Sequence, residues 1–165
     1  MEHSEGKAMP LTKPEPTVHQ VLSYSYLVYF LSFILAVILD KVFKLPLLPH
    51  NHAKWGIPIL IIGTLIIAWA QSISGAGRHA RAHTPETIDK DHFSRGPYVF
   101  TRSPTHLGIA LMIIGFGFFI NSLTVIIVTV IAYVLTKITS IKKEEKILEE
   151  RFGQPYRDYK KKVRF

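Results

Sequence analysis

The stretch GPYVFTRSPTHLG, residues 96–108, places two side chains capable of chemistry where an apolar segment begins. Arg102 carries a guanidinium and His106 an imidazole, whereas the residues that follow are almost all apolar. A cation at the boundary of a lipid bilayer is costly unless it is paired or binds a polar ligand. The stretch therefore indicates a polar site at the end of a membrane helix, with Arg102 in need of a partner.

A glutamate interrupts the apolar stripe of the last expected helix. From residue 138 the apolar positions recur at helical spacing, at Ile138, Ile141, Leu148 and Phe152. At about 100° per residue, Glu145 lies inside this stripe and Glu144 at its edge. The strongly polar positions face away: Lys142, Lys143, Lys146 and Glu150. A carboxylate near lipid is a candidate for function, although pairing with a surface lysine is the alternative.

Four apolar blocks separated by polar sequence predict an all-α integral membrane protein. A helix needs about 20 mainly apolar residues to cross a bilayer. We expect four transmembrane helices, over residues 21–40, 56–74, 105–120 and 123–140, and a cytoplasmic amphipathic C-terminal helix over residues 141–152. Residues 1–20 are polar and rich in proline, which predicts a disordered tail before a single domain over residues 21–165.

The third and fourth blocks are separated only by Asn121 and Ser122. This break favours an antiparallel helical hairpin over one helix of about 32 residues, because Asn and Ser are poor residues for a helix interior. A hairpin brings the polar ends of both helices together. We therefore predict that Arg102 and Glu145 meet, or share a polar ligand.

Small residues recur on the third helix at a spacing of seven. Gly108 and Gly115 share one face, and Ala110 and Gly117 share another. Such positions allow a neighbouring helix, or a ligand, to approach the backbone closely.

The net charge of +8 is distributed by topology. With four spans, the N-terminus, the 74–105 segment and the C-terminus lie on one side and carry 2, 5 and 10 of the 20 lysines and arginines. The positive-inside rule then places both termini in the cytoplasm. No nucleic-acid motif accompanies the charge, whereas the basic tail suits anionic membrane lipid.

No metal site is expected. The chain has no cysteine, which excludes thiolate ligands and disulfides. His79 and His83 have the spacing of a helical zinc pair, but their segment is basic and lacks a following carboxylate. Residues 50–52, His-Asn-His, are expected on the non-cytoplasmic loop in contact with headgroups.

Two blocks in the C-terminal half form a recognisable pair. Gly96-Pro97-Tyr98, Arg102, Pro104, Gly108 and Gly115 follow the pattern G-P-Y-x-x-x-R-H-P-x-Y-x-G. After the hairpin, IKKEEKILEERFGQPYRDY follows E-E-x-x-L-x-x-x-F-G-x-x-Y-x-x-Y. Together they resemble the isoprenylcysteine carboxyl methyltransferases and the related phospholipid N-methyltransferases, which are integral membrane methyltransferases.

The resemblance implies methyl transfer from S-adenosylmethionine to a lipophilic or lipid-linked carboxylate, amine or thiol that arrives from the bilayer. It implies a cytoplasmic cofactor pocket formed by Tyr98, Arg102, Ser103, Pro104, His106, Gly108, Glu144, Glu145 and Tyr156. Arg102, His106 and Glu145 are the expected catalytic residues. The guanidinium suits the cofactor carboxylate, a glutamate suits its ammonium or ribose, and a tyrosine ring suits adenine or the sulfonium.

Two positions depart from the family pattern: Ser103 replaces its histidine and His106 its second tyrosine. The acceptor and the oligomeric state stay open at this point. An amine acceptor would have to lose a proton first, to His106 or a glutamate.

The alternatives to methyl transfer are a non-catalytic membrane scaffold and an NADPH-dependent enzyme similar to sterol reductases. A small transporter is less favoured, because the middle of the spans carries no polar residues beyond Ser and Thr.

Overall fold

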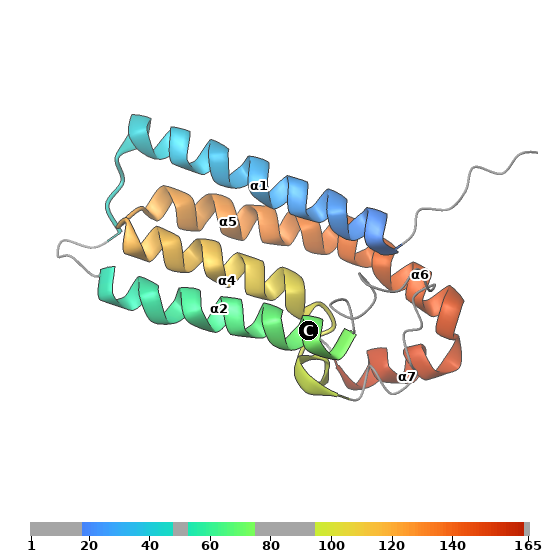
Figure 1. Cartoon of the computed structure of the whole chain (residues 1–165). Coiled ribbons are helices and arrows are strands. Elements are labelled where there is room, and N and C mark those ends of the chain that lie inside the picture. The colour runs from blue at the N-terminus through green and yellow to red at the C-terminus, as the bar shows by residue number, and fades with distance from the viewer. Residues whose placement is uncertain (1–17, 48–52, 75–94, 164–165) are drawn as a thin grey trace, which may run out of the picture.

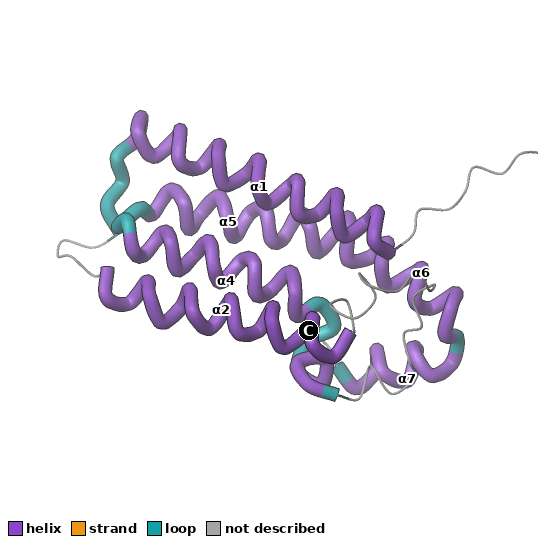
Figure 2. The backbone as a smooth tube through the Cα atoms, in the orientation of Figure 1, coloured by secondary structure: helices purple, strands orange, loops and turns teal. Residues whose placement is uncertain are grey.

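Four long helices run side by side in the computed structural model, which describes residues 18–47, 53–74 and 95–163 (Figure 1). The long helices are α1 (Val18–Phe43), α2 (Ala53–Ser74), α4 (Pro104–Phe119) and α5 (Leu123–Thr136). The shorter elements are the 3-10 turn η2 (Gly96–Val99), the π-helical turn η3 (Lys137–Ile141), α6 (Lys142–Phe152) and α7 (Gln154–Lys162). The described residues form no β-strand (Figure 2), which confirms the all-α fold class.

Three stretches of the described residues are long and apolar enough to cross a membrane: Val21–Phe43, Lys54–Ile73 and Leu123–Glu150. The last one continues from α5 through η3 into α6. The fourth expected span, α4, is apolar but has only 16 residues. The chain is therefore an integral membrane protein in which α4 is shorter than its neighbours.

The α4–α5 hairpin is confirmed, and a single continuous helix is wrong. Asn121 has a positive φ of 57°, a conformation that Asn tolerates better than most residues. Ser122 then caps α5, because its Oγ accepts a hydrogen bond of 3.2 Å from the N–H of Val125. The Ser122 hydroxyl also donates to the carboxylate of Asp40 on α1.

Reciprocal glycine contacts join α2 to α4. A Cβ on Gly63 would lie 2.7 Å from the carbonyl oxygen of Gly108, and one on Gly115 would lie 2.6 Å from the backbone nitrogen of Leu60. The predicted close approach is therefore confirmed, and a helix makes it. On another side of α4, Ala110 packs with Tyr29 of α1 and with α5.

Most polar elements gather at one end of the bundle. This end contains the first turns of α1, the last turns of α2, and the whole of η2, α6 and α7 (Figures 1 and 2). At the opposite end the segment after α1 meets the hairpin turn, where the N–H of Leu123 donates to the Leu45 carbonyl at 3.0 Å. The order α2, α4, α5, α1 across the bundle places α4 and α5 in the centre.

One helix, α7, was not predicted. Gly153, with a φ of 60°, ends α6, and Pro155 lies in the first turn of α7, where its missing N–H costs nothing. The predicted C-terminal helix corresponds to α6. Its four polar positions are exposed as predicted: Lys142, Lys143, Lys146 and Glu150.

The predicted position of Ile138 in the buried stripe is wrong. Its side chain is 53% exposed, whereas Ile141 is buried. The π-helical turn between α5 and α6 accounts for this, because it changes the helical phase from that of a regular α-helix.

Several expectations concern residues outside the described part. These are most of the predicted tail (residues 1–17), the His79 and His83 pair, and residues 50–52. Helix α1 begins at Val18, three residues inside the predicted tail. The single domain stays a prediction.

Candidate functional site

The loop that carries Arg102 is held against the end of α2. Gly96 has a positive φ of 59°, and a side chain there would collide with Ile73 of α2. The N–H groups of Phe100 and Thr101 both donate to the Pro97 carbonyl at 3.1 Å, which closes the turn. This geometry leads the chain directly into α4 and fixes where the Arg102 side chain begins.

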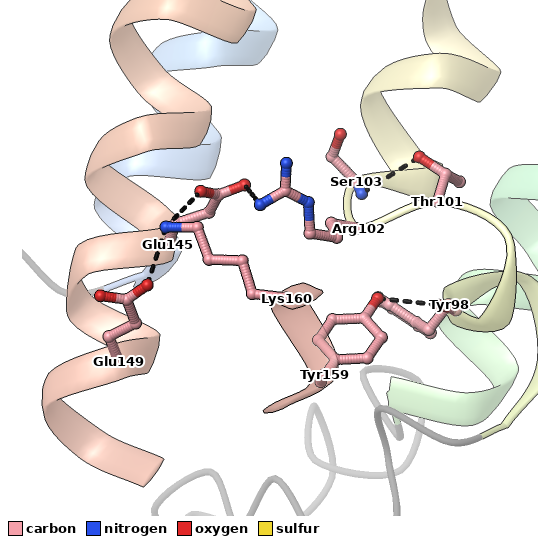
Figure 3. A network of polar contacts seen from close by, with 8 residues as sticks. All are labelled: Tyr98, Thr101, Arg102, Ser103, Glu145, Glu149, Tyr159 and Lys160. Carbon is pink, nitrogen blue, oxygen red and sulfur yellow. Dashed lines mark hydrogen bonds and ion pairs between the residues drawn. The ribbon is translucent and has the colours of Figure 1, made fainter. Parts of the chain in front are cut away.

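Arg102 forms an ion pair with Glu145, as predicted (Figure 3). Arg102 Nη1 lies 2.8 Å from Glu145 Oε1, and the two side chains are only 16% and 12% exposed. Lys160 of α7 approaches the other carboxylate oxygen at 3.0 Å and Glu149 Oε1 at 2.7 Å. The network therefore balances two cations against two carboxylates from three elements.

Lys160 and Glu149 are members of the network that the sequence analysis missed. The hydrogen bond to Glu149, followed by its interactions with Glu145, raises the pKa of Lys160, so the lysine stays charged. The sequence predicts that the basic tail, which includes Lys160, Lys161 and Lys162, contacts anionic lipid. The helical phase of α7 could have separated Lys160, which turns inward, from its exposed neighbours Lys161 and Lys162.

Tyr159 ties α7 to the loop before α4. Its hydroxyl donates to the carbonyl oxygen of Tyr98 at 2.7 Å. Tyr156 is 1% exposed, and its ring packs 5.7 Å from that of Tyr159 in a small core. Burial raises the pKa of both tyrosines, so both stay neutral. Tyr156 is thus a packed wall beside the network, and Tyr98 contributes its carbonyl group to the loop geometry.

A second polar pair lies deeper in the bundle. His106 Nε2 is 3.6 Å from Glu144 Oε1, too far for a hydrogen bond. The side chains are 1% and 13% exposed, and neither atom has a hydrogen-bond partner among the described residues. An unsatisfied buried polar group costs about 1–3 kcal/mol, which is why such groups are rare in folded proteins.

Two hydroxyl groups extend this pair toward α1. The ring of Tyr29 on α1 lies 6.2 Å from the ring of His106. The hydroxyls of Tyr29 and Thr136 are neighbours, although their geometry falls outside a normal hydrogen bond. We call Tyr29, His106, Thr136 and Glu144 the buried polar cluster. It draws on α1, α4, α5 and α6, and the sequence analysis predicted only its histidine and its glutamate.

Three other predicted site residues shape the backbone. Ser103 is buried, and its N–H donates weakly to Thr101 Oγ1 at 3.4 Å. Pro104 is fully buried at the start of α4. Gly108 faces Gly63 and Ile67 of α2, so helix packing accounts for this glycine. Among the predicted residues, the side chains of Arg102, His106, Glu144 and Glu145 converge on the polar end of the bundle.

The described residues hold no group of three or more histidines and acidic side chains that could bind a metal ion. Arg102 with Glu145 offers a matched cation and anion, and His106 with Glu144 offers two groups that can accept a proton. The arrangement therefore suits a zwitterionic ligand beside a proton transfer.

The sequence pattern of the phospholipid methyltransferase family matches residues 53–155, from α2 into the first turn of α7. No curated protein and no solved structure matches the chain. The family match covers the first block, the hairpin and the second block as far as Pro155, and it leaves out α1 and most of α7. It agrees with the geometry in which η2, α4 and α6 converge. The chain belongs to the phospholipid methyltransferase family of integral membrane methyltransferases.

Proposed function

We propose that the protein transfers a methyl group from S-adenosylmethionine to an amine-bearing lipid. Family membership supports methyltransferase activity on a lipid-type substrate. The observation that carries the proposal further is the pair of buried, unbonded groups His106 and Glu144 beside the Arg102–Glu145 ion pair. The reaction needs both a binding site for a charged cofactor and, for an amine, a proton acceptor.

The ion-pair network has the donor set that the amino-acid end of S-adenosylmethionine requires. Arg102 can hold a carboxylate with two parallel hydrogen bonds, and Glu145 can accept from an ammonium or from ribose hydroxyls. Lys160 also holds Glu145, so this carboxylate keeps one partner if Arg102 turns toward the cofactor. The carboxylate of the cofactor would thus meet the opposite charge of Arg102, and its ammonium would meet that of Glu145.

Arg102 and Glu145 would hold S-adenosylmethionine, which would supply an electrophilic methyl group to the acceptor nitrogen and keep the electron pair of the broken carbon–sulfur bond. Glu144 takes the proton that the ammonium form of the acceptor must lose before this attack. His106 is the neighbouring group that can share or pass on that proton. The two side chains are 1% and 13% exposed, so their surroundings restrict their positions and shield them from most water.

We further propose that the end of the bundle with α6 and α7 faces the cytoplasm. That end carries Arg102, Lys160 and the other basic residues of α6 and α7, whereas Lys41, Lys44 and Lys54 belong to the opposite end. The positive-inside rule then places both chain termini in the cytoplasm.

Calorimetric titration of S-adenosylmethionine into the purified full chain in detergent tests the cofactor site. We expect micromolar binding by the wild type and by Glu150→Gln, whose side chain is exposed on the same helix. We expect Arg102→Ala and Glu145→Gln to lose binding. A folded wild type that binds no S-adenosylmethionine would exclude the proposed function.

Glu144→Gln tests the proton acceptor separately. It keeps the size of the side chain and removes its basicity, so cofactor binding should persist while methylation of a lipid amine falls by about a hundredfold or more. A lipid-linked carboxylate, which needs no proton acceptor, is the comparison substrate. Preferential methylation of that carboxylate would contradict the assignment of an amine.

A further inference from the structure

An apolar groove runs along the bundle between α1, α2 and α4. Its volume is about 370 Å³, and α4 supplies the floor with residues such as Ile113 and Phe116. Phe30 and Phe33 of α1 form one wall, and Leu60 of α2 lies on the other. Phe33 packs edge-on against Phe116, with ring centroids 5.3 Å apart. The groove therefore has the shape and chemistry of a site for a hydrocarbon chain.

The groove adjoins the buried polar cluster at Tyr29. Tyr29 belongs to both features: it lines the groove, and its ring lies 6.2 Å from that of His106. Tyr26, one turn earlier on α1, also lines the groove. The apolar groove thus lies next to polar groups that lack hydrogen-bond partners among the described residues.

We infer that the acceptor lipid lies in this groove, with an acyl chain on the α4 floor and its amine headgroup at the buried polar cluster. The inference rests on the proposed function and assigns where its substrate binds. Continuity between the groove and the cluster supports an acceptor lipid here, because an amphiphile needs both surfaces at once.

The wall formed by α1 determines which acceptor lipid the groove selects. Helix α1 lies outside residues 53–155, so the family pattern does not describe Tyr26, Tyr29, Phe30 or Phe33. These residues are specificity determinants for the acceptor, whereas the proposed cofactor residues come from the loop between η2 and α4 and from α6. Tyr29 is a positioning residue that offers its hydroxyl to the headgroup.

A groove-filling substitution provides the main test. Ile113→Trp places a large ring on the floor of the groove, and Ile131→Trp places the same ring on the exposed face of α5. The full chain is assayed in mixed micelles with a long-chain phospholipid that has a primary amine headgroup. A water-soluble short-chain phospholipid with the same headgroup is the comparison substrate.

We expect Ile113→Trp to raise the KM for the long-chain lipid about tenfold, the loss expected when roughly two methylene groups give up apolar contact. The KM for the short-chain lipid and the affinity for S-adenosylmethionine should stay unchanged. Ile131→Trp should match the wild type in all three measurements.

Two milder variants protect the test against misfolding. Phe30→Ala removes an exposed side chain from the wall and should also raise the KM for the long-chain lipid alone. Tyr29→Phe keeps the packing and removes the hydroxyl, so it should reduce the methylation of both lipids equally. Tyr24→Phe, an exposed change on α1, should leave the methylation of both lipids unchanged.

The failure of this inference differs from the failure of the proposed function. Methylation with an unchanged long-chain KM in both Ile113→Trp and Phe30→Ala would show that the groove holds bulk lipid only, and it would overturn the inference alone. A wild type that binds no S-adenosylmethionine and methylates no lipid would overturn both.

Discussion

Arg102 Nη1 lies 2.8 Å from Glu145 Oε1, which joins the loop before α4 to α6 across the α4–α5 hairpin. The pair is largely shielded from water, and Lys160 adds a third charged group from α7. A mostly buried ion pair adds little net stability, because the attraction between its charges is offset by the cost of removing them from water. The loss of one partner is strongly destabilising, because the other charge is left buried and unpaired. The contact therefore couples the geometry of the loop to the position of α6.

A double-mutant cycle measures this coupling. Arg102→Met and Glu145→Met should each destabilise the protein, and the double variant should be more stable than the sum of the two losses predicts. The expected coupling is about 1–3 kcal/mol, measured by unfolding in detergent. Strictly additive losses would mean that the contact contributes nothing to stability.

Tyr159→Phe tests the attachment of α7. It removes the hydrogen bond to the Tyr98 carbonyl and leaves the ring in its core, so the expected loss is about 0.5–1.5 kcal/mol. Hydrogen exchange should become faster in α7 and in the loop before α4. Tyr24→Phe on the exposed face of α1 is the matched control, and equal exchange in both variants would exclude the bond as an anchor.

We predict that the protein loses stability at alkaline pH when Lys160 loses its proton. Because its pKa is raised above the ordinary value of 10.5, its contribution is complete below pH 10.5 and is lost as the pH rises through the higher folded-state value. Unfolding at increasing alkaline pH should show this loss in the wild type and in Lys161→Met. Lys160→Met should lack it, and an identical pH profile in that variant would contradict the role of Lys160 in the network.

Gly63→Ala tests the contact between α2 and α4. The new methyl group would lie 2.7 Å from the Gly108 carbonyl oxygen and from the Met112 nitrogen, both of which belong to the backbone. Because the helices must separate to accept it, we expect a loss of about 1–3 kcal/mol. Ala68→Val, which adds carbon atoms at an exposed position of α2, should be nearly neutral in the same unfolding assay.

Ser122→Ala tests the turn of the hairpin. It removes both the cap of α5 and the hydrogen bond to Asp40, so we expect a loss of at least about 1 kcal/mol. Ser72→Ala, whose hydroxyl bonds the Trp69 carbonyl at an exposed site, is the control. Equal stability of the two variants would exclude a structural role for the Asp40–Ser122 contact.

The helices of the bundle, the hairpin and the meeting of Arg102 with Glu145 are predictable from the amino-acid sequence alone. These features follow from local patterns: the length of apolar blocks, the poor helix propensity of Asn121-Ser122, and the direction that a hairpin imposes on the two flanking polar residues. The prediction of a buried Ile138 was wrong, because it assumed a regular period of 3.6 residues where the chain forms a π-helical turn.

The three-dimensional packing alone fixes which face of each helix meets which neighbour. It assigned Gly108 to helix packing, turned Lys160 of α7 into the ion-pair network and brought Tyr29 of α1 beside His106. These contacts join residues that are far apart in the chain and depend on how helices rotate and pack in three dimensions. No local pattern specifies that rotation, because it results from all the side chains that meet at each interface.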